Sequence, residues 1–244
     1  MGQLKTSKIK IIKMRAILLS FIFISLAIMM SCEKADVELT PLASLNLINV
    51  SVILGPVKAK LTDKEGLYSL ITATVPYNGY AVYGITASRS VPITVVSSTD
   101  TTNTVFNSEL KFNDGDIYSL FLTGQIGNVE TIMIKENIPA FSDSLCGVRF
   151  INLSYNSNPV NITLTTTPEV AEFSNLTYKQ ISDFKTYPAL STNVSYSFQV
   201  RDAVTSNLLA SFTLPTPRFR AVTLTLTGVA GGSPALSVIR INHY

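Results

Sequence analysis

The clearest pattern in this sequence lies near the C-terminus, in Arg220-Ala221-Val222-Thr223-Leu224-Thr225-Leu226-Thr227-Gly228. Aliphatic residues alternate here with threonines, so each kind of side chain points to its own face of an extended chain. A period of two over this length is typical of a half-buried β-strand. We therefore expect a strand that covers a hydrophobic core with one of its faces.

The same alternation recurs along most of the chain. It is present in Tyr196, Phe198 and Val200, and in Ile162 and Leu164 against their neighbouring threonines. In the first half it predicts strands at residues 45–51, 57–61, 67–74, 93–97, 118–123 and 129–135. Turn residues recur about every ten positions, which favours a sandwich or barrel over βαβ units. A competing helix over residues 169–184 is disfavoured by its threonine, tyrosine and serines, so the sequence predicts an all-β fold.

An internal repeat divides the chain. Residues 45–51 (Leu-Asn-Leu-Ile-Asn-Val-Ser) reappear 103 positions later as Val-Arg-Phe-Ile-Asn-Leu-Ser, and residues 120–124 (Leu-Phe-Leu-Thr-Gly) reappear 104 positions later. Nearly equal offsets at both ends indicate duplication, and each unit has the size of an immunoglobulin-like sandwich. We predict two tandem immunoglobulin-like β-sandwich domains, at residues 44–139 and 148–244, joined by a linker at 140–147.

The N-terminus is typical of an exported lipoprotein. Five basic side chains and no acidic one precede the apolar run of residues 16–30, as in a signal peptide. That run would span about 22 Å as a helix, less than the roughly 30 Å of a hydrocarbon core. Ser31-Cys32 resembles the end of a lipobox, although Met29 stands where Leu, Val or Ile is usual. We expect a lipoprotein signal peptide at 1–31, acyl chains on Cys32 and a flexible tether at 32–43. The alternatives are an uncleaved anchor and ordinary secretion.

Removal of the leader changes the charge. The full chain has 19 basic and 16 acidic side chains, and the leader holds five of the basic ones. The mature chain would carry a net charge of about −2, which gives no long-range attraction to nucleic acid, so no nucleic-acid partner is expected. Cys146 would be the one unmodified cysteine left. No intrachain disulfide can form, and we expect Cys146 to be an inert, partly buried thiol.

The two opening strands, the middle segments 80–88 and 178–189 and the closing Leu-Thr-Gly strands resemble a known family. They are similar to lipoproteins of Bacteroidetes that carry the domain of unknown function 4397. Ser154-Tyr155-Asn156-Ser157-Asn158-Pro159-Val160 is similar to a Ser-Pro-Asn-Ser-Pro-Ala-Val run in that family, with Tyr155 in place of a proline. The resemblance implies an immunoglobulin-like or transthyretin-like sandwich at the cell surface, and no catalytic residue.

The residues favour no catalytic centre, metal site or cofactor. The single histidine, His243, stands next to the C-terminus, where it is expected to flank a final strand, and no Gly-x-Ser-x-Gly elbow occurs. Asp114 and Asp116 in Asn113-Asp114-Gly115-Asp116 form the best local carboxylate pair. They are expected to shape a hairpin turn, with a weak ion site and glycosidase chemistry as alternatives. No cluster of cysteine and histidine suits zinc.

Two kinds of candidate site remain. Tyr77, Tyr80 and Tyr83 could form a small ligand-binding platform, although their spacing places neighbours on opposite faces of a strand. Asp100-Thr101-Thr102 and Asp143-Ser144-Leu145 are similar to the O-glycosylation acceptor sequence of Bacteroidetes, so Thr101 and Ser144 are candidate modification sites.

Taken together, these features predict a non-catalytic lipoprotein of the outer membrane that acts as a surface binding or adhesion module. Its expected partners are the membrane, through Cys32, and a surface glycan or protein. The alternative is a structural subunit that exchanges a strand, for which residues 235–244 are the candidate. A glycan-active hydrolase is the weakest of the three hypotheses.

Overall fold

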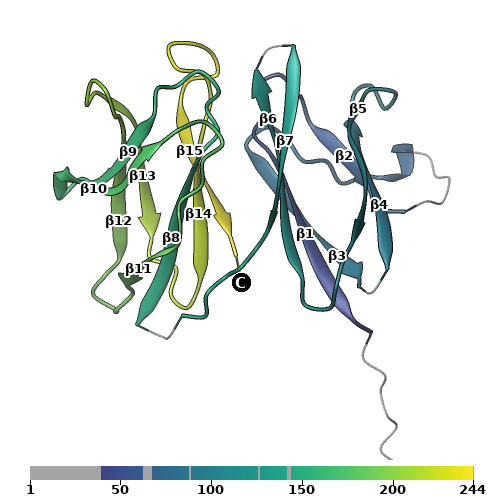
Figure 1. Cartoon of the computed structure of the whole chain (residues 1–244), viewed down its shortest axis with the longest axis horizontal. Helices are drawn as coiled ribbons and strands as arrows, with labels where there is room; N and C mark the ends of the chain where they lie inside the picture. Colours follow the sequence, from purple (N-terminus) through teal and green to yellow (C-terminus); the bar gives the residue numbers. More distant parts are fainter. Residues whose placement is uncertain (1–39, 63–67, 88, 126, 142–143, 244) are drawn as a thin grey trace, which may run out of the picture. The chain divides into compact units, whose positions relative to one another are not determined.

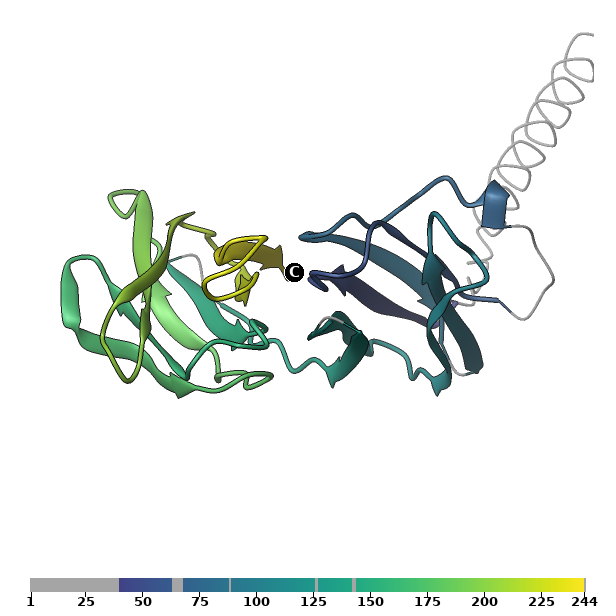
Figure 2. The same ribbon diagram turned by 90° about the horizontal axis from the view of Figure 1, so that it is seen from above.

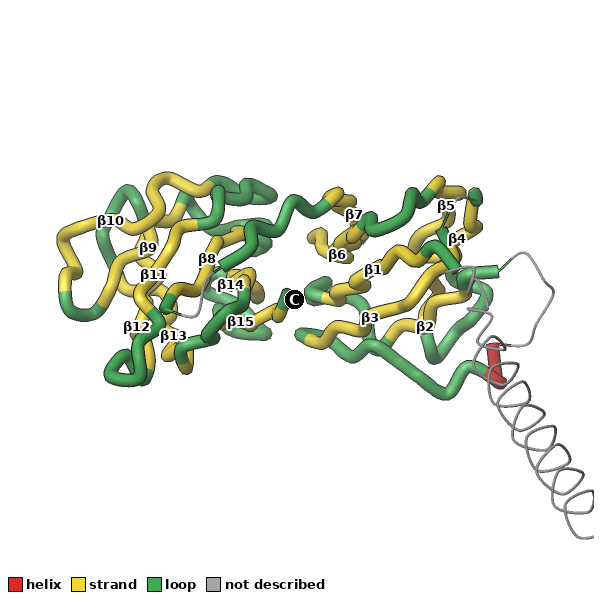
Figure 3. Tube along the Cα trace, turned by 90° about the horizontal axis from the view of Figure 1, so that it is seen from below, coloured by secondary structure: helices red, strands yellow, loops and turns green. Residues whose placement is uncertain are grey.

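The computed structural model describes residues 40–62, 68–87, 89–125, 127–141 and 144–243. Within these ranges almost all regular structure is β-strand, and the one helix is a 3-10 turn at Tyr68–Leu70 (Figure 3). The prediction of an all-β fold is confirmed. The predicted signal peptide at 1–31 and Cys32 lie outside the described residues.

Two sheets enclose the core of the first half. One sheet contains, in spatial order, β3 (Gly79–Thr86), β1 (Leu42–Asn49), β6 (Ile117–Gln125) and β7 (Asn128–Lys135) (Figure 1). The other contains β2 (Val57–Lys60), β4 (Ser90–Ser97) and β5 (Thr104–Lys111). β1 and β6 are parallel, and the other neighbouring strands are antiparallel. Leu45, Ile93 and Leu120 are among the buried residues of this core.

The second half repeats this plan with one more strand. One sheet has the order β11 (Lys185–Pro188), β8 (Leu145–Asn152), β14 (Ala221–Thr227) and β15 (Ser237–Asn242). The other has the order β10 (Thr167–Leu176), β9 (Val160–Leu164), β12 (Ser195–Asp202) and β13 (Leu208–Pro215). β8 and β14 are parallel, like β1 and β6. Figure 2 shows the strands of this half as the green and yellow ribbons. Phe150, Phe198 and Leu224 lie in the hydrophobic core of this half.

One asparagine plays the same role in each half. The side-chain amide of Asn49 donates hydrogen bonds to the carbonyls of Gly55 and Val75, and its oxygen accepts from the Ser51 N–H. Asn152, at the repeated position, donates to the Leu176 carbonyl and accepts from the Ser154 N–H. Buried backbone groups require such partners, which explains why the Asn-x-Ser sequence recurs at the ends of β1 and β8.

A third hydrophobic cluster joins the two four-stranded sheets that contain β1 and β8. It includes Ile48, Phe121, Ile151 and Ile241, which are fully buried. These residues alternate along their strands with those of the first two cores, so both faces of the β1 and β8 sheets are covered. Thr40–Tyr244 accordingly forms one compact unit.

Several boundaries differ from the expectations. The predicted strand at 67–74 is wrong: Tyr68–Leu70 is a 3-10 turn, and in the described residues only Val75 bridges to β2. The helical alternative for 169–184 is also wrong, because β10 continues to Leu176. β1 begins at Leu42, inside the predicted tether, and β8 begins at Leu145, inside the predicted linker. Leu145 is a strand residue because it pairs with Pro188 on β11.

Candidate ligand-binding site

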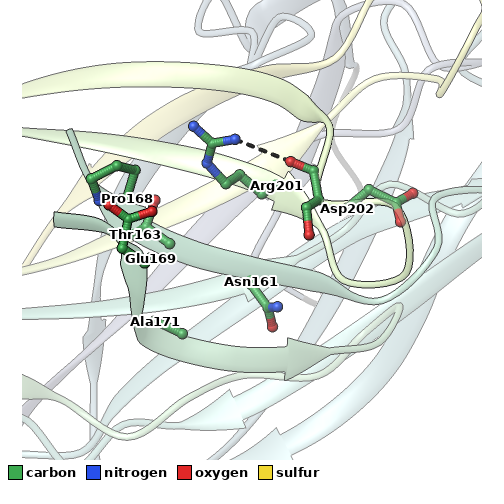
Figure 4. A pocket seen from close by; sticks show the side chains of 8 residues that line it. Asn161, Thr163, Pro168, Glu169, Ala171, Arg201 and Asp202 are labelled. Carbon is green, nitrogen blue, oxygen red and sulfur yellow. Dashed lines mark hydrogen bonds between the residues drawn. The ribbon is translucent and has the colours of Figure 1, made fainter.

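The strongest candidate for a ligand site is a hollow of about 410 Å³ on the sheet that contains β9, β10 and β12 (Figure 4). Pockets that hold small ligands occupy roughly 300–1,000 Å³. We name this hollow the Arg201 pocket. Its lining residues are Asn161, Thr163, Pro168, Glu169, Ala171, Arg201, Asp202 and Ser206.

A bulge in β10 shapes the pocket. Thr167 pairs with Leu164 and Ala171 pairs with Thr163, so residues 168–170 have no partner on β9. Pro168 has no N–H to contribute to a ladder and is tolerated at such a point. Bulges bend their strand and are frequent beside functional sites. Here the bulge brings Pro168 and Glu169 to the rim of the hollow.

The alternation of β9 and β12 supplies the floor. Ile162 and Val200 are fully buried in the core between the sheets. Because neighbouring side chains on a strand point to opposite faces, Asn161, Thr163 and Arg201 extend from the other face of the sheet. Sticks from β9, β10 and β12 surround one space in Figure 4.

Thr163 has a hydroxyl without a partner. The residue is only 3% exposed, and its Oγ1 makes no hydrogen bond within the described part of the chain. Most buried polar side-chain atoms in proteins have at least one partner, and an exception calls for an explanation. Because Thr163 lines the pocket, a hydroxyl or carbonyl group of a bound ligand would satisfy it.

Arg201 is held in place and still has free donors. Its Nη1 donates to the Ser206 carbonyl at 3.0 Å, the dashed line in Figure 4. Its Nε and Nη2 donate to Gln199 Oε1 at 3.2 and 2.7 Å. A guanidinium group has five N–H donors, so two of them remain for a ligand. A fixed cation loses little freedom when it binds.

Asp202 lines the pocket and holds the turn that follows β12. Its Oδ1 accepts hydrogen bonds from the backbone N–H groups of Val204 and Thr205, and its Oδ2 accepts from Asn158 Nδ2. These hydrogen bonds lower the pKa of Asp202, and the bond from the Thr205 backbone has the largest effect. Both oxygens therefore fix the turn between β12 and β13. Asp202 therefore holds the turn that carries Ser206, and both of its carboxylate oxygens are engaged in hydrogen bonds.

Glu169 is the free acidic group of the pocket. It is exposed and forms no salt bridge with any residue that the structure describes. Its carboxylate can accept hydrogen bonds, while Arg201 and the Asn161 amide can donate them and Thr163 can do both. A lining of mixed donors and acceptors suits a ligand rich in hydroxyl groups, because each hydroxyl also donates and accepts.

The three predicted tyrosines do not form one platform. Tyr83 packs against the first core, and its buried hydroxyl has no partner in the described residues. Burial also raises its pKa. Tyr80 lies on the other face of β3 and packs against the third cluster. Tyr77 precedes β3, with its hydroxyl buried. Tyr80 also lines a second hollow.

The predicted modification sites are placed as follows. Thr101 is exposed in the turn between β4 and β5. Ser144 is partly buried just before β8, and the preceding Asp143 lies outside the described residues. Glycosylation of either residue stays a prediction. Cys146 is fully buried, and burial raises the pKa of its thiol to about 11, as expected for an inert cysteine.

The aspartate pair forms a turn. Asp114 Oδ1 accepts a hydrogen bond from the Leu42 N–H, and Asp116 Oδ2 accepts from the backbone and side chain of Asn113. Asp116 Oδ1 forms a salt bridge with Lys135 at 2.8 Å. These contacts agree with the expected turn. No group of three metal-binding side chains occurs in the described ranges, and no helix there is long and apolar enough to cross a membrane.

His243 lies in a buried polar chain that the sequence did not predict. Its Nε2 is 2.6 Å from Thr223 Oγ1, and this hydroxyl oxygen accepts a hydrogen bond from Arg149 Nε at 2.8 Å. Arg149 in turn forms a salt bridge of 2.7 Å with Glu136. Burial lowers the pKa of His243 to about 4, so the ring is neutral at pH 7. The signal that could have revealed this was the placement of polar residues on the non-core face of β8 and β14.

No family model matches this chain, and no curated protein matches it. Three solved structures align with it at low similarity. A family CBM26 carbohydrate-binding module of Eubacterium rectale Amy13K in complex with maltoheptaose has 9% identity and a TM-score of 0.27, covering 83% of this chain and 97% of its own. Family 41 modules from streptococcal virulence factors that recognise α-glucan have 9% identity and a TM-score of 0.24. The alignment covers 81% of this chain and 96% of theirs. A candidate adhesin of Bacteroides ovatus has 13% identity and a TM-score of 0.23. The alignment covers 88% of this chain and 99% of the adhesin. TM-scores this low carry no argument about ligand or activity.

Proposed function

We propose that this protein is a non-catalytic binding module of the cell envelope, held to the outer membrane by acyl chains on Cys32. The Arg201 pocket binds its ligand, a surface glycan. The observation that carries this proposal is the buried hydroxyl of Thr163, which lines the pocket and has no partner among the described residues.

The composition of the pocket supports a glycan. Each sugar hydroxyl donates one hydrogen bond and accepts others, so its site must offer both kinds of group. Arg201 and Asn161 offer donors, Glu169 offers an acceptor and Thr163 offers both. Pro168 adds a small apolar surface at the rim. Most of these groups extend from strands, which hold a site more precisely than loops do.

Binding without turnover fits the carboxylates. Glycosidases commonly need two carboxyl groups on opposite sides of the scissile bond. Of the two acidic residues that line the pocket, Asp202 is committed to its turn and Glu169 is free. One free carboxylate can orient a sugar but does not complete that pair.

The lipid anchor rests on the sequence. The basic and apolar leader, Ser31-Cys32 and the resemblance to Bacteroidetes lipoproteins support it. Multiple acyl chains hold a protein stably at a membrane, whereas a single chain holds it only marginally. An acylated Cys32 would keep the sandwiches close to the surface on which their ligand is displayed.

A glycan array probed with full-length protein in mild detergent tests the binding function. We expect Thr163→Val to reduce the affinity for any bound glycan about fivefold to tenfold, because one hydrogen bond with the ligand is lost. Thr165→Val is the matched control, since Thr165 is exposed and does not line the pocket. Equal affinities of the Thr163 variant and the wild type would contradict the proposal, as would an array without any bound glycan.

A second candidate function is a structural subunit that exchanges a strand. The observation in its favour is the position of β15, which lies at the edge of its sheet and, among the strands that the structure describes, pairs with β14 alone. Size-exclusion chromatography with and without residues 235–244 tests it. A polymerising subunit would lose its assembly on truncation, whereas a protein that runs as a monomer in both forms would not be such a subunit.

A further inference from the structure

A second hollow, distinct from the Arg201 pocket, combines unpartnered polar groups with positive charge. We name it the Tyr80 pocket. It has a volume of about 370 Å³ and is lined by Asn46, Tyr80, Val82, Arg220, Asn242 and His243. Asn46 belongs to β1, Tyr80 and Val82 to β3, and Asn242 to β15. These residues lie within the compact unit Thr40–Tyr244.

Two buried side chains of this pocket have polar atoms without partners. Asn46 is 3% exposed and His243 is 4% exposed. Asn46 Oδ1 and His243 Nδ1 make no hydrogen bond within the described ranges. A buried polar group without a hydrogen-bond partner destabilises the protein. Two such atoms in the lining of one pocket indicate a polar occupant.

The network behind His243 identifies its free atom as a donor. Thr223 Oγ1 accepts a hydrogen from Arg149 Nε and lies 2.6 Å from His243 Nε2. If the Thr223 hydroxyl donates to Nε2, then Thr223 Oγ1, Arg149 Nε and His243 Nε2 all have partners, and the ring proton is on Nδ1. With the proton on Nε2, both the Thr223 hydrogen and Nδ1 would lack a partner among the described residues. The first arrangement leaves fewer groups unpaired, so His243 presents an N–H.

Tyr80 presents a second donor. Asn242 Nδ2 donates to the Tyr80 hydroxyl oxygen at 3.0 Å, which leaves the hydroxyl hydrogen for another acceptor. The oxygen of the Asn242 amide accepts from Arg240 Nε at 2.6 Å. The Asn242 side chain therefore orients both Tyr80 and Arg240.

The charge of the pocket is positive. Arg220 is exposed, and none of the six lining residues is acidic. Burial lowers the pKa of Arg240, and the positive charge of nearby Arg220 also lowers it. Guanidinium groups bind carboxylate and other oxyanions with strong, charge-assisted hydrogen bonds.

We infer that the Tyr80 pocket binds a sugar that carries a carboxylate or sulfate group. The acidic group lies against Arg220 and accepts hydrogen bonds from the Tyr80 hydroxyl and the His243 N–H. A ring hydroxyl of the same sugar donates to Asn46 Oδ1. This site does not depend on the glycan proposed for the Arg201 pocket, because the two pockets share no lining residue.

Three related sugars test the inference by isothermal titration calorimetry on the full-length protein in mild detergent. Galacturonate carries a carboxylate, galactose 6-sulfate carries a sulfate, and galactose carries neither. We expect at least one of the acidic sugars to bind at millimolar concentration and galactose to bind at least tenfold more weakly. The two acidic arms distinguish a carboxylate ligand from a sulfate ligand.

Arg220→Gln is the decisive variant, with Arg218→Gln as its matched control. Both arginines are exposed and lie two residues apart, but only Arg220 lines the pocket. We expect Arg220→Gln to weaken binding of the acidic sugar about tenfold, and Arg218→Gln to leave it unchanged. Absence of binding by both acidic sugars, equal binding of galactose, or wild-type affinity in the Arg220 variant would each overturn the inference.

Discussion

Thr163 combines burial, a missing partner and a place in the Arg201 pocket. Valine has nearly the shape of threonine but no hydroxyl. In the unliganded protein we expect Thr163→Val to be neutral or to raise the free energy of unfolding by about 1 kcal/mol, because an unsatisfied group leaves the interior. Urea unfolding measures this effect. The same substitution should weaken ligand binding, so stability and affinity move in opposite directions. A loss of more than about 1 kcal/mol would show that the hydroxyl has a structural partner.

His243 makes stability depend on pH. Its pKa falls from 6.5 in the unfolded chain to about 4 in the folded protein, first because of burial. The unfolded chain therefore binds a proton at higher pH than the folded protein does. The contribution of His243 is fully present above pH 6.5 and is lost as the pH falls toward about 4. The pKa difference corresponds to roughly 3 kcal/mol.

Urea unfolding of the wild type and of His243→Gln, at pH values above 6.5 and near 4, isolates the contribution of His243 to stability. Glutamine cannot titrate, and its side-chain oxygen can still accept from Thr223. We expect the wild type to lose about 3 kcal/mol more than the variant across the range. The carboxylates are the same in both proteins, so they cancel in the comparison. Identical pH dependence in the two proteins would show that His243 is not buried as a neutral ring.

The ends of β6 and β14 explain a second part of the repeat. Each of these strands runs into Leu-Thr-Gly, and both glycines have positive φ, +122° at Gly124 and +93° at Gly228. A Cβ at Gly124 would lie 2.2 Å from the Asn128 carbonyl oxygen, and one at Gly228 would lie 2.3 Å from that of Ala235. The backbone of the following segment therefore excludes any side chain at both positions.

We expect Gly228→Ala to destabilise the protein by about 2 kcal/mol or more, because the change combines backbone strain with a clash against main-chain atoms. Gly84→Ala is the matched control. Gly84 lies on β3, where an added Cβ would meet no atom within 4 Å, and its substitution should change stability by no more than about 0.5 kcal/mol. Thermal unfolding compares the two variants. Equal shifts would mean that the turn after β14 rearranges without cost.

The elements that the sequence predicted are those with unbroken alternation. The β14 pattern was clear because each side chain of Ala221–Thr227 has a fixed face. β10 was not recognised because its unpaired residues 168–170 interrupt the period of two. Since that bulge shapes the Arg201 pocket, the pocket residues could not be predicted either. Alternation at 67–74 predicted a strand that is absent because, among the described residues, only Val75 finds a partner on β2.

At the scale of the whole molecule, the two halves share one plan, which is what a duplication predicts. The parallel pair β1–β6 of the first half recurs as β8–β14 in the second. The hydrogen bond from the Asn49 side chain to a backbone carbonyl recurs at Asn152. Among the described residues β10 has no counterpart strand in the first half, and the Arg201 pocket lies beside β10. Repeated residues could be recognised in the sequence. The Tyr80 pocket could not, because its lining comes from strands of both halves.

Attachment to the membrane is the last prediction, and the chain contains its own control. Cys32 and Cys146 are the two cysteines of the sequence. Cys146 is fully buried and its thiol pKa is raised to about 11, so it should not react. Metabolic labelling with palmitate should mark the wild type and Cys146→Ser equally and leave Cys32→Ser unlabelled. The Cys32 variant should also leave the membrane fraction, unless its leader remains uncleaved as an anchor. Label retained by Cys32→Ser, or absent from the wild type, would contradict acylation at Cys32.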